Sequence, residues 1–282
     1  MIEKHMREGL ALTAFVTAAL TLGGCAAAPK TSVSLDQAAQ SVQTEDAQGP
    51  TLRLARAART SGDYSSAMNL YRTFLATKPD RADISLELAD TMLDAGIIDD
   101  AMKTYEAIPA TSPSRLGAEL GLARAELMMQ NPQKAIIHYE TALAKSPKDA
   151  RALVDWGVAL DLSGRHADAQ TAYRQVLTAD ARNVAARNNL ALSLAIDGRY
   201  QEAIDILTPM AASTNATARI RQNLALVYWL KKDYSKAATI SRLDLDQNAT
   251  DANLKFFQMV ETTRAAPVAE PSPSSPPPAP AQ

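Results

Sequence analysis

The sequence predicts an all-α fold, a solenoid of repeated helix–turn–helix units, and three observations carry that prediction. Alanine recurs every 34 residues from Ala67 to Ala237 with no insertion, and a fixed period of that length is the signature of a repeat array. Aromatic residues make up only 5% of the chain, and only 11 of its 282 residues are glycine. Because strands favour aromatic and β-branched residues, a composition this rich in alanine favours helices over sheets.

Each repeat carries the same landmarks. A large apolar residue is followed at once by a small one, as in Leu54-Ala55 and Trp156-Gly157. Two antiparallel helices approach closely only where their side chains are small, so these positions mark helix crossings. The recurring alanines are Ala67, Ala101, Ala135, Ala169, Ala203 and Ala237, and the large apolar residues are Leu54, Leu88, Leu122, Trp156, Leu190 and Leu224.

A break in the helical pattern separates two helices within each repeat. It reads Gly62-Asp63-Tyr64 in the first repeat, Asn131-Pro132 in the third and Lys232-Asp233-Tyr234 in the sixth. Glycine supplies the left-handed residue that ends a helix. Proline then recurs at Pro79 and Pro113, where it ends a helix or lies in the loop beyond it.

These residues resemble the tetratricopeptide repeat. The shared features are a small residue at the eighth position, glycine in the turn, alanine at the twentieth position and proline at the thirty-second, together with tyrosine at the twenty-fourth (Tyr71, Tyr105, Tyr139, Tyr173). The last two repeats depart from the pattern, with Leu207 and Ser241 in place of the tyrosine. The resemblance implies a right-handed superhelical solenoid of about six units: 48–81, 82–115, 116–149, 150–183, 184–217 and 218–249.

The last repeat needs a cap, because each helix pair leaves an apolar face that only a neighbour can cover. Residues 251–264 have the length and pattern of a capping helix, with Phe256, Phe257 and Val260 facing inward. The tail 265–282 holds seven of the 15 prolines of the chain. We expect it to be extended and disordered, either as a simple solvated tail or as a Pro-rich ligand or spacer.

The N-terminus carries an uncharged run from residue 9 to 24 after Lys4 and Arg7, which is too short for a membrane span and typical of a signal peptide (1–24). Translation from Met1 or from Met6 fits equally. Leu22-Gly23-Gly24-Cys25 resembles a bacterial lipobox, which implies that Cys25 is acylated and begins the mature chain. Two or three acyl chains would give stable membrane attachment. The following Ala26, rather than Asp, implies sorting to the outer membrane of a Gram-negative host, facing the periplasm.

Residues 25–47 are small and polar, and they are interpreted as the lipidated cysteine with a flexible tether to the first repeat. The net charge of −2 argues against nucleic-acid binding driven by bulk positive charge, and we expect no nucleic-acid partner. One cysteine and three histidines cannot supply a thiol-rich metal site or an intrachain disulfide. No nucleophile elbow, phosphate loop or zinc-protease motif is present, although a Ser-His-Asp site formed by distant residues stays open. We therefore expect neither an enzyme nor a cofactor.

The solenoid implies a long concave face, lined by the first helix of each repeat, that binds extended or helical peptide segments. In the family the second, fifth, sixth, ninth and thirteenth positions of the repeat face this groove. The partner-binding residues predicted from that register are Arg53, Arg56, Asp83, Glu87, Asp90, Asp94, Arg124, Arg151, Asp155, Asn188, Asn189, Arg219, Gln222 and Asn223.

Asn189 and Asn223 occupy the same position in successive repeats. Amides both donate and accept hydrogen bonds, so such a row can bind a peptide backbone, and similar rows in some tetratricopeptide proteins do so. The alternative is that these amides only bond neighbouring helices.

The order of lipobox, tether, repeats and Pro-rich tail resembles the tetratricopeptide lipoproteins of tight-adherence (Tad/Flp) pilus loci. The stretches 187–195 and 220–246 look particularly similar. This resemblance implies an outer-membrane protein that helps to localise or assemble the pilus secretin, with a segment of the secretin or of another assembly protein as its partner. Two alternatives remain: a scaffold for another envelope machine, such as outer-membrane protein insertion or polysaccharide export, and a regulator of peptidoglycan enzymes.

Overall fold

The computed structural model describes residues 49–265, a range that contains thirteen α-helices and no strand. The predicted signal peptide, Cys25, the tether and the Pro-rich tail beyond Ala265 lie outside the described residues. The helices are α3 (Pro50–Thr60), α4 (Tyr64–Thr77), α5 (Ala82–Asp94), α6 (Ile98–Glu106), α7 (Arg115–Met128), α8 (Pro132–Lys145), α9 (Ala150–Leu162), α10 (His166–Ala179), α11 (Val184–Ile196), α12 (Tyr200–Ala211), α13 (Ala218–Leu230), α14 (Tyr234–Ser241) and α15 (Gln247–Ala265). Within residues 49–265, no helix is both long enough and apolar enough to cross a bilayer.

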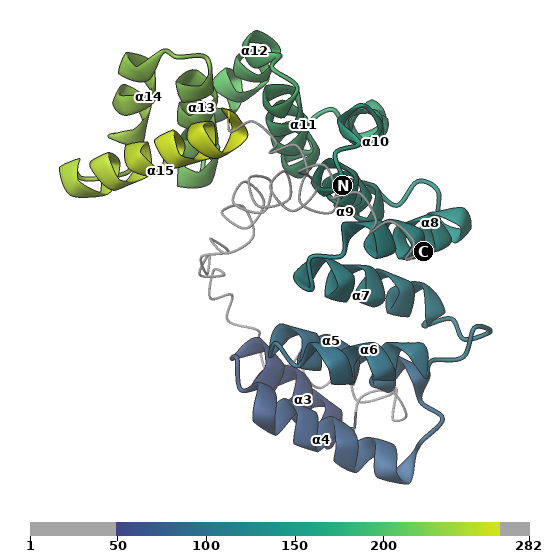
Figure 1. The fold of residues 1–282 in the computed structure, drawn as a ribbon. Coiled ribbons are helices and arrows are strands. Elements are labelled where there is room, and N and C mark those ends of the chain that lie inside the picture. The colour runs from purple at the N-terminus through teal and green to yellow at the C-terminus, as the bar shows by residue number, and fades with distance from the viewer. Residues whose placement is uncertain (1–48, 266–282) are drawn as a thin grey trace, which may run out of the picture. The chain divides into compact units, whose positions relative to one another are not determined.

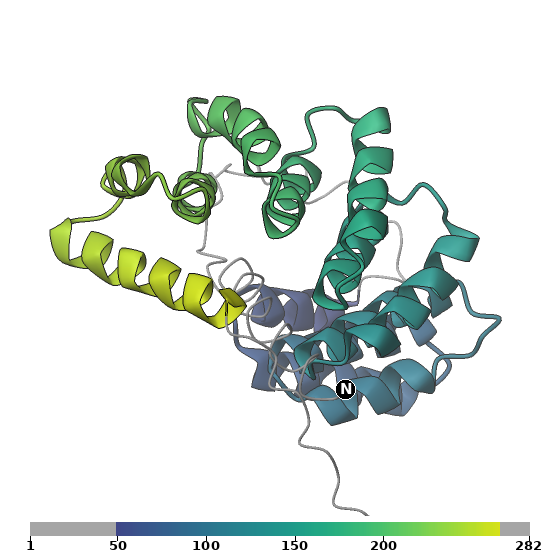
Figure 2. The same ribbon diagram turned by 45° about the horizontal axis from the view of Figure 1, so that its top comes forward.

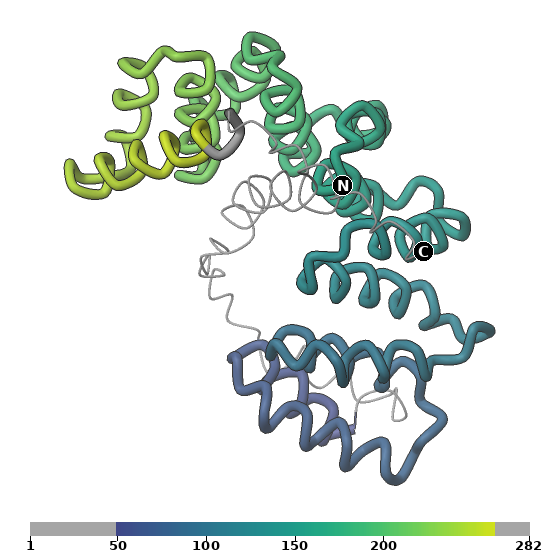
Figure 3. The backbone as a smooth tube through the Cα atoms, in the orientation of Figure 1, coloured from purple at the N-terminus to yellow at the C-terminus, as the bar shows by residue number. Residues whose placement is uncertain are grey.

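The described helices fall into two compact units, divided after Asp197. The N-terminal unit holds α3 to α11, and each of these helices packs against the next along the chain (Figure 1). The backbone of this unit can be followed through successive helix–turn–helix pairs in Figure 3. First helices of neighbouring repeats also touch, α5 against α7 and α9 against α11. This all-helical, sequential packing confirms the predicted all-α solenoid.

The turn inside every repeat contains one residue in the left-handed conformation, and these six residues are 34 apart. Four are glycine, which adopts positive φ without steric cost. In the third repeat the residue is Gln130 (φ 60°), one position before the predicted break at Asn131-Pro132, and in the sixth it is Lys232 (φ 67°). The second helix then begins at a cap such as Asp63, whose carboxylate accepts from the backbone N–H of Ser66.

The recurring alanines and tyrosines form the core. All six alanines at the twentieth position are fully buried, and so are the four repeat tyrosines to within 1%. The tyrosine rings fill space that small residues leave open: a Cβ added to Gly121 would lie 2.3 Å from the ring of Tyr105, and one added to Gly157 would lie 2.4 Å from the ring of Tyr173. Neighbouring helices therefore approach at a separation that only glycine permits at these two positions.

The C-terminal unit holds α12 to α15, and α15 packs against both α13 and α14. Figure 2 shows α15, in yellow, running across these two helices. The helix begins at Gln247, four residues before the predicted start of the cap. Phe257 and Val260 are buried, Phe256 is half-buried, and the ring of Trp229 on α13 packs against that of Phe257. The indole N–H of Trp229 donates to Glu261 at 3.0 Å, which adds a polar contact to this apolar packing.

Candidate partner-binding face

The predicted groove residues of the N-terminal unit lie on the first helices α3, α5, α7, α9 and α11, and we call the surface that they form the first-helix face. Arg53, Asp83, Asp94 and Arg151 are exposed on it, and Asn188 is buried. The remaining members are half-buried, namely Arg56, Glu87, Asp90, Arg124, Asp155 and Asn189. Arg219, Gln222 and Asn223 lie on α13 in the C-terminal unit, the first exposed and the other two half-buried.

Arg56 on α3 and Glu87 on α5 form a two-pronged ion pair. The guanidinium Nε donates to Glu87 Oε2 at 2.8 Å, and Nη2 donates to Oε1 at 2.6 Å. The hydroxyl of Tyr71 donates to the same Oε2 at 2.9 Å. The hydrogen bond to Glu87 raises the pKa of Arg56 against the opposing effect of burial. Two residues predicted to contact a partner thus hold the first two repeats together.

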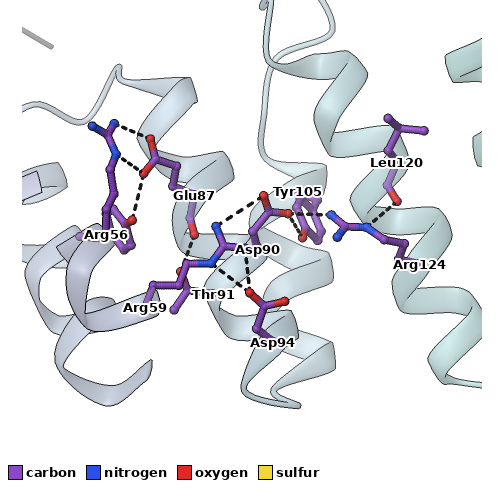
Figure 4. A network of polar contacts seen from close by, with 10 residues as sticks. Arg56, Arg59, Glu87, Asp90, Thr91, Asp94, Tyr105, Leu120 and Arg124 are labelled. Atoms are coloured by element: carbon purple, nitrogen blue, oxygen red, sulfur yellow. Dashed lines mark hydrogen bonds and ion pairs between the residues drawn. The ribbon is translucent and has the colours of Figure 1, made fainter. Parts of the chain in front are cut away.

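Asp90 and Asp94 continue this network across three repeats (Figure 4). Asp94 accepts two hydrogen bonds from Arg59, at 2.9 and 2.7 Å. Asp90 accepts from the hydroxyl of Tyr105 at 2.7 Å and from Arg124 Nη2 at 2.9 Å. The charged residues predicted to line the groove in the first three repeats therefore largely neutralise one another. Their positions in the repeat did not indicate this pairing.

Arg59 was not among the predicted site residues. It lies at the twelfth position of its repeat, and together with Arg56, Thr60, Tyr71, Glu87 and Asp94 it lines a hollow of about 460 Å³. The sequence could have indicated Arg59, because this basic residue lies 35 positions before Asp94, close to one repeat length. That spacing brings side chains of neighbouring repeats together.

The junction between the third and fourth repeats differs from those before it. Tyr139 is fully buried, yet its hydroxyl has no hydrogen-bond partner among the described residues. Burial raises its pKa, and the nearby carboxylate of Asp155 raises it further, while Arg124 and Arg151 lower it. Burial also raises the pKa of Asp155 itself, against the same two arginines. This junction therefore brings an unsatisfied hydroxyl, one carboxyl group and two guanidinium groups together.

The amide side chains predicted to line the groove mainly form hydrogen bonds within the protein. Asn188 is only 3% exposed, and its Nδ2 donates to Asn189 Oδ1 at 3.1 Å. Gln222 accepts from Asn253 Nδ2 of α15 at 2.6 Å. Asn188 is thus too buried to line an accessible face, because its helix turns it toward the core, and the cap helix already bonds Gln222. Peptide binding by Asn189 and Asn223 stays a prediction.

Both histidines of the described region face carboxylates. His138 Nδ1 lies 2.8 Å from Glu119, which also accepts from Arg115 at 2.8 Å. His166 Nδ1 lies 2.9 Å from Asp161 Oδ1, and Ser193 donates to the same oxygen at 2.7 Å.

Ser193 shares the carboxylate of Asp161 with His166, so it is the candidate nucleophile of a Ser-His-Asp site. A nucleophilic serine is activated by a hydrogen bond to the histidine base. Here the fully buried Ser193 bonds the carboxylate instead. The cluster therefore lacks the arrangement of a triad, and Tyr173, which donates to Asp161 Oδ2 at 3.0 Å, completes it as a polar bridge between helices. Residues 49–265 also contain no group of three or more metal-ligating side chains.

Comparison with known proteins gives the family. Models described as tetratricopeptide repeat match residues 58–127, 120–169 and 154–208, which together span more than half of the chain. A search of curated proteins gave no match.

Among solved structures, the chain is similar to a tetratricopeptide repeat protein from Parabacteroides merdae, with 14% identity and a TM-score of 0.57 over 74% of this chain and 97% of that one. It is similar to TTC0263 from Thermus thermophilus, with 21% identity and a TM-score of 0.54 over 64% and 97%. YrrB, described as having an unusual peptide-binding site, shows 15% identity and a TM-score of 0.51 over 66% and 97%. At these identities the likeness shows the fold. Together with the matches to the family models, it places the chain among the tetratricopeptide-repeat proteins.

Proposed function

We propose that this protein is a scaffold that binds a peptide segment of a partner protein on its first-helix face, with the junction of the third and fourth repeats as the anchoring point. Stacked helical repeats offer extended surfaces for protein–protein interaction. The observation that carries the anchoring point is that Arg151 is exposed and Asp155 half-buried beside Tyr139, whose hydroxyl has no partner among the described residues. The hydroxyl itself is fully buried, so a peptide would contact the charged groups around it rather than the hydroxyl.

The surrounding groups fit such a segment. Arg151 is exposed and can donate to a carbonyl or carboxylate, and Asp155 can accept from a peptide N–H. The corresponding groups of the first two junctions already bond each other through Glu87 and Asp90. A partner would therefore gain more binding free energy at the third junction. The peptide-binding site reported for YrrB supports peptide recognition as a use of this fold.

For the cellular setting, we propose an outer-membrane lipoprotein, acylated at Cys25 and facing the periplasm, that serves a Tad/Flp-type pilus by localising or assembling its secretin. The support is the lipobox Leu22-Gly23-Gly24-Cys25 and the likeness of residues 187–195 and 220–246 to that family. A scaffold for outer-membrane protein insertion or polysaccharide export, or a regulator of peptidoglycan enzymes, would use the same face with a different partner.

One co-purification experiment tests the partner and the site together. The tagged protein is purified from detergent-solubilised membranes, and the pilus secretin in the eluate is measured for the parent, for Arg151→Glu and for Arg72→Glu. Arg72 is an exposed arginine on the second helix α4, so the control makes the same charge change away from the first-helix face. We expect only Arg151→Glu to reduce secretin recovery, by tenfold or so for a loss of about 1.4 kcal/mol. Secretin absent from the parent eluate refutes the pilus assignment, whereas equal recovery with both variants refutes the site.

The anchor has its own test. Cys25→Ser removes the acylated thiol, so the variant should leave the membrane fraction and lose the mass of the acyl chains. Membrane retention with an unchanged mass shift would show that the lipoprotein assignment is wrong.

A further inference from the structure

The first repeat has an exposed apolar face, whereas the equivalent residues of the next two repeats are buried. Leu54, at the seventh position of its repeat, is 58% exposed. Its equivalents in the next two repeats are Leu88, 6% exposed, and Leu122, 1% exposed. A leucine at this position is normally covered by the preceding repeat, and among the described residues no helix precedes α3.

A hollow of about 740 Å³ lies at this face, between the outer sides of α3 and α4. Its apolar lining comes from Leu54, Ala57 and Ala58 of α3 and from Leu70 of α4. Burial of apolar surface stabilises a protein. The end of a repeat array accordingly needs a capping element whose own outer face is polar.

The chain just before α3 carries the sequence pattern of such an element. Leu35, Ala38, Ala39 and Val42 follow the i, i+3, i+4, i+7 spacing of one helix face. Ser34 lies directly before this stripe, and Gln37 three residues after Ser34, which together match the capping box that begins helices. The positions between the stripe residues are polar, as expected for the outer side of a cap.

The connection is also the right length. Gly49 is extended and Pro50 begins α3, so a preceding helix must end before Gly49. A helix over residues 35–44 would leave residues 45–49 as its link to α3. Helix–helix connections of about 2–8 residues join antiparallel neighbours, so this link would return the chain alongside α3.

We propose that residues 35–44 form an N-terminal capping helix, whose stripe of Leu35, Ala38, Ala39 and Val42 covers Leu54 and the hollow beside it. The tether predicted over 25–47 would then shorten to residues 25–34. Ten residues span at most about 36 Å, which limits the distance between Cys25 and the first repeat. The proposed cap depends neither on lipidation nor on the identity of the partner.

Amide hydrogen exchange on the full 282-residue chain, purified in mild detergent, tests the cap. In the parent, the amides of residues 38–44 should exchange about tenfold or more slowly than those of an unstructured peptide. Val42→Asp puts a charge into the contact and should abolish this protection, whereas the matched control Val33→Asp lies before the stripe and should leave it intact. Leu54→Asp should abolish the same protection from the other side of the contact.

Two results would overturn the proposal. Exchange of residues 38–44 in the parent at the rate of an unstructured peptide means that no cap forms. Sedimentation that shows a dimer dissociated by Leu54→Asp, with residues 38–44 unprotected in both, assigns the face to a second copy of the chain. Because Leu54→Asp leaves a charge on an exposed surface, loss of the fold is not expected, and the exchange of α5 to α8 checks that the rest of the unit is intact.

Discussion

The junction between the second and third repeats and the junction between the third and fourth use the same tyrosine differently. Tyr105 and Tyr139 are both fully buried and lie one repeat length apart. Asp90, 15 residues before Tyr105, accepts a hydrogen bond from the hydroxyl of that tyrosine. The residue 15 before Tyr139 is Arg124, and a guanidinium group cannot accept a hydrogen bond.

The charge at the ninth position therefore decides whether the tyrosine of the same repeat finds its acceptor there. Where the ninth position is acidic, the tyrosine, the carboxylate and the next arginine bond one another and hold the repeats together. Where it is basic, the hydroxyl depends on a carboxylate of the next repeat, which Tyr71 contacts in Glu87 and Tyr139 lacks. The repeat scaffold is the same in both cases, so stability and partner binding can be varied separately along one array.

The largest expected effect comes from overpacking the junction between the second and third repeats. Gly121→Ala would place a Cβ 2.3 Å from the ring of Tyr105, which cannot move because it is fully buried. Overpacking of this kind costs about 1–3 kcal/mol in the free energy of unfolding, measured by urea titration. The control is Gly117→Ala in the same helix, whose Cβ would meet only the flexible end of Leu86. Equal stability of the two variants would show that the ring can yield.

The second prediction is that removing the carboxylate charge changes stability in opposite directions at the two junctions. Asp90→Asn weakens hydrogen bonds from Tyr105 and Arg124, at a cost of about 1.5 kcal/mol. Asp155→Asn should stabilise the protein at pH 7, because burial raises the pKa of Asp155 above its unfolded value, despite the opposing arginines.

The pH dependence follows from the direction of that shift. The raised pKa means that the folded state prefers the protonated carboxyl, so stability falls as the pH rises from the unfolded value, about 4, through the folded one. The gain from Asp155→Asn should therefore be present at pH 7 and disappear below about pH 4. Thermal unfolding at pH 3.5 and at pH 7 measures both limits, and a gain that persists at pH 3.5 would contradict the titration of Asp155.

A third, smaller difference concerns the hydroxyls themselves. Tyr105→Phe removes a hydrogen bond to Asp90 and should cost about 1 kcal/mol. Tyr139→Phe removes an unpartnered hydroxyl and should leave the free energy of unfolding unchanged or slightly higher. If the Tyr139→Phe variant loses as much stability as the Tyr105→Phe variant, then Tyr139 has a partner within the protein and the third junction is closed as well.

The smallest expected effect concerns the turns of the same two repeats. The second repeat turns at Gly96 (φ 76°), whereas the third turns at Gln130 (φ 60°). A side chain in the left-handed region is strained, so Gln130→Gly should raise stability by about 0.5 kcal/mol after the greater flexibility of glycine in the unfolded chain is counted. The control Gln133→Gly, within the exposed part of α8, should lower stability by about 1 kcal/mol. Thermal unfolding of both variants separates turn geometry from helix propensity.

Much of the fold could be predicted from the sequence because repeat packing is local. The alanines at the twentieth position, the tyrosines at the twenty-fourth and most turns recur at one spacing, and each contacts residues of its own or the adjacent repeat. The position of the turn in the third repeat was missed by one residue, because Gln130 adopts a conformation that its type does not indicate.

For the first-helix face, the sequence predicted which positions lie on it but not which side chains contact each other. The register placed Arg56, Glu87 and Asp90 on first helices. Nothing in it showed that Arg56 bonds Glu87, that Asp90 bonds Arg124, that Asn188 faces the core or that Arg59 joins the network. These contacts join side chains 31 to 35 residues apart, and they depend on rotamers and on the approach of neighbouring helices. The sequence by itself thus determined the period, the buried positions and the helix pairs, because these follow from local spacing. Only the tertiary structure decided which charges neutralise each other and which hydroxyl stays unsatisfied, because hydrogen bonding depends on distances of a few ångströms between repeats.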